Sequence, residues 1–162
     1  MLHRPIRPED ELHEQRFLAR LSPDARRKRF QQWAGRIDGE LAHFYTNIDY
    51  DRHMAFVCAA RDEQGDRLVG EARYIANPGG ESCEFGIVVA DDWQHTGVAQ
   101  LLMRDLMHVA AERGIQTMAS LVLASNAGML DFARELGFAL APAAEDPRLV
   151  RITKTLGGQV LK

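Results

Sequence analysis

The sequence has only two cysteines, Cys58 and Cys83, among 162 residues, and this scarcity excludes a fold held together by disulfide bridges. Both lie in apolar segments, so we expect them to be buried rather than reactive. No spacing of cysteine and histidine residues suggests a metal site. The apolar runs fall far short of the ~18 residues that cross a bilayer, and residues 1–5 lack an apolar signal region. We therefore expect a soluble, cytoplasmic protein with no membrane partner and no metal.

An excess of charge of either sign is also lacking. The net charge is −3 and the isoelectric point is near 6.1, which argues against a general binder of nucleic acid. The basic run at residues 26–29 covers about one helical turn, and such a run is more often a solvated face than a nucleic-acid contact. Docking of an acceptor protein is the alternative interpretation of this run.

What the chain does have is enough apolar material for one compact core. Hydrophobic residues make up 46% of the sequence and charged residues 27%. This composition and length predict a single domain over residues 1–162. Periodicity and turn residues predict a mixed α/β fold with one sheet, whose strands are expected at 2–7, 54–60, 68–76, 83–90, 117–124, 138–142 and 148–155, and whose helices are expected at 9–21, 23–34, 97–113 and 127–136. Residues 35–52 favour no element.

The most informative segment is a strand followed by a short loop and a long amphipathic helix. The loop has the pattern Gln94-x-x-Gly97-x-Ala99. A helix N-terminus carries unpaired N–H groups and a partial positive charge, and small residues let a bulky diphosphate approach the backbone. The pattern is not a P-loop, because it lacks Gly-Lys-Ser/Thr. The alternative is that Gly97 and Ala99 only permit close helix–sheet packing.

This loop resembles motif A of the GNAT acyltransferases. Segments across nearly the whole chain are similar to the acetyltransferase domain of bacterial Pat-type protein lysine acetyltransferases, namely residues 4–10, 21–23, 48–52, 69–74 and 84–89. The resemblance implies the GNAT fold, a central mixed and mostly antiparallel sheet of about six or seven strands flanked by helices. It also implies acetyl-CoA as co-substrate.

The resemblance further implies where the cofactor binds. The loop residues expected to contact the pyrophosphate are Gln94, His95, Thr96, Gly97, Val98 and Ala99, and the main chains of Ile87, Val88 and Val89 are expected to contact the thioester and the pantetheine arm. His95 either contacts phosphate or is simply exposed. Asn126 either hydrogen-bonds the cofactor or only caps a helix.

Acyl transfer to a lysine needs a base. The amine has a pKa near 10.4, so at pH 7 only about 1 in 2,500 is neutral, a cost of roughly 4.6 kcal/mol. The resemblance assigns the catalytic base to Glu84, although the alternating pattern of this strand also fits a glutamate that merely faces solvent. Glu71 and Arg73 are expected near Glu84, where they either line the acceptor groove or pair with each other.

The sequence departs from the family pattern at two places. Thr96 stands where the commoner loop has an arginine, which removes one possible phosphate contact. Many GNAT enzymes protonate the leaving thiolate with a tyrosine seven residues after the asparagine, and here that position is Ala133. Pat-like sequences also tend to lack this tyrosine, so the general acid stays undetermined.

The acceptor is expected, by resemblance, to be a protein lysine side chain that attacks directly in a ternary complex. An acyl-CoA synthetase is a candidate protein acceptor. A small-molecule amine is the alternative acceptor. A sensor that binds acyl-CoA without catalysis is the alternative function, because no phenol is available at position 133.

Overall fold

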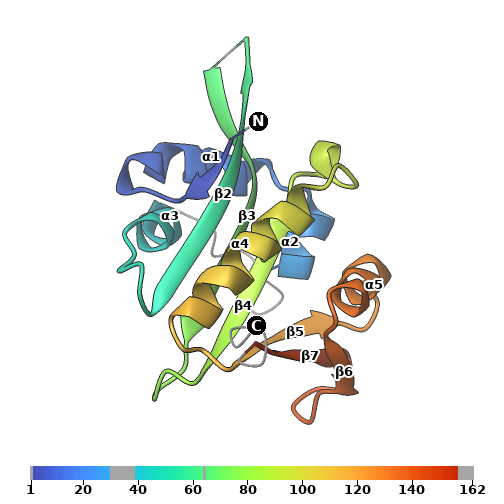
Figure 1. Ribbon diagram of the computed structural model, residues 1–162. Coiled ribbons are helices and arrows are strands. Elements are labelled where there is room, and N and C mark those ends of the chain that lie inside the picture. The colour runs from blue at the N-terminus through green and yellow to red at the C-terminus, as the bar shows by residue number, and fades with distance from the viewer. Residues whose placement is uncertain (1, 30–38, 64, 157–162) are drawn as a thin grey trace.

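A seven-stranded sheet forms the centre of the molecule, and the computed structural model describes residues 2–29, 39–63 and 65–156 of the chain (Figure 1). The strands are β1 (Leu2–Pro5), β2 (His53–Asp62), β3 (Gly65–Ala76), β4 (Ser82–Val89), β5 (Thr117–Leu123), β6 (Ala139–Pro142) and β7 (Leu149–Thr155). Their order is β1-β2-β3-β4-β5-β7-β6, and all neighbours are antiparallel except β4 and β5. The predicted mixed, mostly antiparallel sheet is confirmed.

Helices cover both faces of this sheet. One face packs against α4 (Val98–Glu112) and α5 (Ala127–Glu135), and the other against α1 (Glu11–Arg20), α2 (Pro23–Arg29) and α3 (Gly39–Thr46). Helix α4 lies unusually close to β3, because a Cβ at Gly70 would come within 2.8 Å of Val98 Cγ1. Within the described residues, no helix combines the length and the hydropathy needed to span a membrane.

Local patterns predicted most elements within a few residues. Helix α3 was not predicted, because it is short and buries only a narrow stripe, chiefly Ala42 and Tyr45. The predicted helix at 23–34 is confirmed over Pro23–Arg29, and its remainder lies outside the described residues. Cys58 and Cys83 are fully buried, as expected.

The feature that creates a site is the short contact between β4 and β5. These two parallel strands pair only at Ser82–Thr117, Cys83–Met118 and Glu84–Ala119. Beyond Glu84, β4 continues beside β3, whereas β5 continues beside β7. The sheet therefore splits at Glu84, and from there to Val89 the edge of β4 that faces β5 has no strand paired to it.

Candidate active site

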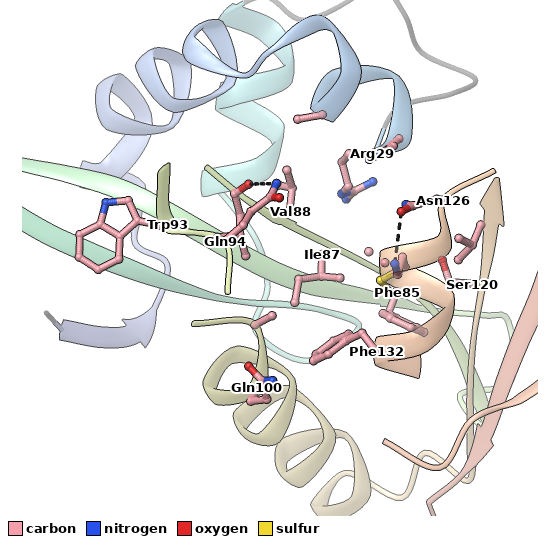
Figure 2. A pocket seen from close by; sticks show the side chains of 18 of the residues that line it. Arg29, Phe85, Ile87, Val88, Trp93, Gln94, Gln100, Ser120, Asn126 and Phe132 are labelled. Atoms are coloured by element: carbon pink, nitrogen blue, oxygen red, sulfur yellow. Dashed lines mark hydrogen bonds between the residues drawn. The ribbon is translucent and has the colours of Figure 1, made fainter. Parts of the chain in front are cut away.

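A cleft of about 570 Å³ occupies the split between β4 and β5 (Figure 2). Its lining comes from β4, from the loop that leads into α4, from β5, and from the facing ends of α2 and α5. Of the predicted cofactor residues, the cleft is lined by Ile87, Val88, Val89, Gln94, His95, Gly97, Ala99 and Asn126. One elongated space thus adjoins both the helix N-terminus and the predicted base.

The N-terminus of α4 closes one end of the cleft. Gly97 is its N-cap residue, with φ of 93°, and no side chain caps the helix. The first intrahelical bond runs from Leu101 N–H to Gly97 C=O at 3.2 Å, so the amides of Val98, Ala99 and Gln100 have no intrahelical acceptor. No acidic residue lies in the first turn. These features fit a bound anion such as a diphosphate.

The rest of the loop is held by its own hydrogen bonds. The Thr96 hydroxyl donates to the Trp93 carbonyl, and the side-chain Nε2 of Gln94 donates to the Val89 carbonyl at 3.4 Å. His95 is exposed and has φ of 63°, which is uncommon for a residue other than glycine. Thr96 and Val98 do not line the cleft with their side chains: that of Val98 is buried in the core. Val98 can therefore contribute only its main chain.

Main-chain groups of β4 alternate between the sheet and the cleft. Ala90 N–H donates to Val69 C=O, and Ser82 C=O accepts from Asn77 N–H, at the two ends of the β3–β4 pairing. Because an antiparallel ladder alternates, even-numbered residues between these ends turn their N–H and C=O groups to β3. The main chains of Ile87 and Val89 therefore face the cleft. That of Val88 does not, which differs from the expectation for this residue.

Glu84 lies at the opposite end of the cleft from the helix. Its carboxylate Oε2 is 3.4 Å from Arg151 Nη1, and 46% of its side chain is exposed. Partial burial raises the pKa of Glu84 above its ordinary value, and the charge of Arg151 opposes this shift. The side chain is thus accessible from the cleft and also anchored by an ion pair from β7.

Glu71 and Arg73 pair with each other beneath the sheet face rather than lining the cleft. Arg73 Nη2 is 2.9 Å from Glu71 Oε1 and 3.4 Å from Glu14 Oε2, and all three side chains are buried. Burial and the Glu71 charge raise the pKa of Glu14 well above its ordinary value, whereas the charge of Arg73 lowers the pKa of Glu71 in spite of its burial. The cluster therefore joins α1 to β3 through buried ion pairs.

Helix α5 forms the far wall. The Oδ1 atom of Asn126 accepts from Met129 N–H at 3.2 Å, which makes Asn126 the N-cap of α5. Met129 and Phe132 follow it at three-residue spacing and line the cleft. Ala133 is buried and offers no proton donor.

Replacing Asn126 separates its two predicted roles. We expect Asn126→Ala to lower the free energy of unfolding by about 1 kcal/mol, and Asn126→Ser to lose much less because serine also caps helices. The cap uses only Oδ1, so the Nδ2 donor is available to the cofactor, and we expect both variants to bind CoA several-fold more weakly. Thermal unfolding and calorimetry measure the two effects. Unchanged CoA affinity in both variants would exclude a cofactor contact and show that Asn126 only caps α5.

Several lining residues were not predicted. These are Ala25, Lys28, Arg29, Phe85, Gly86, Trp93, Gln100, Ser120, Leu121, Val122, Gly128, Met129 and Phe132. The spacing of Met129 and Phe132 after Asn126 is a signal that could have identified them. Docking of an acceptor was one interpretation of the basic run at residues 26–29, but no local signal places Lys28 or Arg29 in the cleft, because their place depends on how α2 packs against β4.

Comparisons with known proteins agree with this geometry. A model of the acetyltransferase (GNAT) family matches residues 10–138. The chain is 38% identical to acetyltransferase PA5475 of Pseudomonas aeruginosa over 138 residues, covering 85% of this chain and 74% of that protein.

Solved structures give the same result. The GNAT domain of PAT from S. lividans aligns with a TM-score of 0.83 and 25% identity, over 95% of this chain and 89% of that one. A ribosomal-protein-alanine N-acetyltransferase from Brucella melitensis aligns with a TM-score of 0.74 and 22% identity, over 96% of this chain and all (100%) of the other, which supports the fold alone.

Proposed function

Because this chain belongs to the acetyltransferase (GNAT) family and so transfers acetyl groups from acetyl-CoA, we propose that its acceptor is a lysine side chain of a protein. The single observation that carries the proposal is the split of the sheet at Glu84. It aligns a carboxylate, an open strand edge and an uncapped helix N-terminus along one cleft. The similarity to the GNAT domain of PAT agrees with the sequence resemblance to Pat-type protein lysine acetyltransferases, which is the source of the proposed acceptor class.

In the proposed mechanism each end of the cleft has one task. The amides of Val98, Ala99 and Gln100 bind the diphosphate of acetyl-CoA, and the main chains of Ile87 and Val89 hold the pantetheine arm and the thioester. Glu84 takes the proton from the lysine ammonium, directly or through water, and the neutral amine attacks the thioester carbonyl in a ternary complex. The tetrahedral intermediate expels CoA as a thiolate, which needs no phenol because thiols ionise near pH 8.5. The thiolate then takes the proton that the attacking nitrogen still carries, directly or through water.

The surface next to Glu84 supports a protein acceptor. Ile75 is the cross-strand partner of Glu84, and 42% of this large apolar side chain is exposed. His53 is the partner of Ile75 on the next strand, and the exposed ring of Phe44 lies 5.3 Å from the His53 ring. Apolar side chains exposed beside a charged site suit a macromolecular partner better than a small polar amine.

The test of the proposed function measures thiol release from acetyl-CoA with a panel of acceptors. The panel contains lysine-bearing proteins, among them an acyl-CoA synthetase, and small amines. We expect turnover with one or more proteins and mass spectrometry to locate the acetyl group on lysine. Turnover with small amines only would contradict a protein acceptor and identify a small-molecule amine as the substrate. CoA binding without turnover of any acceptor would favour a sensor.

The ion pair with Arg151 predicts a shift in pH dependence. Glu84 accepts a proton only when ionised, so activity falls as the pH drops through its pKa. The Arg151 charge lowers this pKa, so Arg151→Ala raises it, and the acid limb of kcat/KM moves to higher pH. Arg148→Ala is the control, because Arg148 pairs with Asp146 at 2.7 Å and not with Glu84. An acid limb that stays in place in Arg151→Ala would contradict the assignment of the limb to Glu84.

A further inference from the structure

The guanidinium of Arg29 lies in the cleft, and Gly86 on β4 leaves the room for it. Arg29 is the last residue of α2 in the described part of the chain. A Cβ on Gly86 would lie 2.5 Å from Arg29 Cζ, 2.7 Å from Nη2 and 2.8 Å from Nε. The guanidinium thus rests on the backbone of β4, and Figure 2 shows it directed into the cleft opposite α5.

The position of this guanidinium along β4 relates it to the acceptor rather than to the diphosphate. Gly86 and Glu84 lie on the same face of β4, two residues apart, a separation of about 6.6 Å. Gly86 is three residues from Val89, after which the loop to α4 begins. Arg29 therefore lies closer to the base than to the helix N-terminus.

The charges that line the cleft favour an acceptor with a negative group. Among the described lining residues, the acidic and basic side chains other than His95 are Glu84, Lys28 and Arg29. Glu84 attracts the ammonium of the acceptor, whereas Arg29 repels it. Lys28 is paired with Asp24 at 2.9 Å, and the charge of Arg29 also acts on the buried Glu71 and Glu14. A carboxylate close to the amine removes this repulsion, and a guanidinium binds a carboxylate with two parallel hydrogen bonds.

We propose that Arg29 is a specificity-determining residue, which binds a carboxylate beside the acceptor amine, so that the preferred acceptor is a lysine flanked by aspartate or glutamate. This inference rests on the proposed function and adds the sequence context of the acceptor lysine. Gly86 is needed for this placement of Arg29, because a residue with a side chain would occupy the space in which the guanidinium lies.

Two isosteric peptides test the preference. They differ only in the residues on both sides of one lysine, which are aspartate in the first and asparagine in the second. We expect wild-type kcat/KM to be at least about tenfold higher for the aspartate peptide, the effect of one charged hydrogen-bonded pair. Arg29→Met should reduce this ratio to near one. Arg27→Met is the matched control, because Arg27 lies on the same helix, pairs with Asp24 at 2.9 Å and does not line the cleft.

Gly86→Ala provides a second route to the same result. Its Cβ displaces the end of a flexible side chain rather than the backbone, so it should reduce the ratio as Arg29→Met does. The double variant Arg29→Met, Gly86→Ala should then show no further loss. If the ratio of kcat/KM between the two peptides is as high in Gly86→Ala as in the wild type, the placement of Arg29 is contradicted.

The remaining outcomes are also decisive. A tenfold ratio retained in Arg29→Met, or lost equally in Arg27→Met, overturns the inference. A loss of CoA affinity in Arg29→Met as large as the loss of the ratio would assign Arg29 to the cofactor. Equal rates on both peptides with the wild type overturn the inference but leave the protein acceptor in place. Turnover with small amines and with neither peptide, nor with any protein, overturns the proposed function itself.

Discussion

Glu84→Gln should lower kcat by about 10- to 1,000-fold, while the affinity for acetyl-CoA stays nearly unchanged. The amide has the shape of the carboxylate but cannot take a proton from the ammonium, and general bases contribute on this scale. The side chain lies at the end of the cleft away from the helix N-terminus, so its replacement leaves the phosphate contacts in place. Steady-state kinetics and calorimetry with CoA measure the two effects.

The control for this variant is Glu81→Gln. Glu81 is exposed, precedes β4 by one residue, and does not line the cleft. Its replacement should leave kcat and the pH profile unchanged. The acid limb of the pH profile should be lost in Glu84→Gln and kept in Glu81→Gln. Wild-type turnover in Glu84→Gln would remove Glu84 from the mechanism.

Gly97→Ala should weaken CoA binding by at least tenfold, about 1.4 kcal/mol. The position has φ of 93° at the N-cap of α4, and nothing lies within 4 Å of where a Cβ would be. The methyl group therefore meets no protein atom and extends into the space through which a diphosphate approaches the amides. Calorimetry with CoA measures the loss.

Gly79→Ala separates this effect from backbone strain. Gly79 has φ of 94°, also has nothing within 4 Å of a Cβ, and lies in the turn between β3 and β4, away from the cleft. Both variants should lose about 1 kcal/mol of unfolding free energy, because left-handed backbone disfavours alanine. Only Gly97→Ala should lose CoA affinity. Equal CoA affinity in the two variants would contradict the phosphate role of the loop.

The candidate site could be predicted from the sequence to the extent that it is local. A strand, a loop with small residues and an amphipathic helix follow one another within residues 82–112, so the phosphate end was recognisable from spacing alone. Glu84 was assigned through a family resemblance, and its catalytic role stays a prediction. Asn126 was recognised as a candidate cap, and its hydrogen bond to Met129 bears this out.

The contacts that set the chemistry of the cleft join residues far apart in the chain. Glu84 meets Arg151, 67 positions away, and Arg29 rests on Gly86. Neither pair leaves a periodic signal, because each depends on strand register and on how a helix packs across the sheet. Even the alternatives for Glu71 and Arg73 could be separated only by the register that places them opposite Val88 and Gly86 over a buried face.

The sequence by itself therefore determined most of the elements, the fold class and the helix N-terminus for which we propose diphosphate binding, since hydrophobic period and backbone preference act over a few residues. Only the tertiary structure decided where the sheet splits, which main-chain groups face the cleft and which charged side chains line it. Those depend on hydrogen-bond pairing between strands that are distant in sequence, and a shift of one residue in that pairing would turn Glu84 to the opposite face.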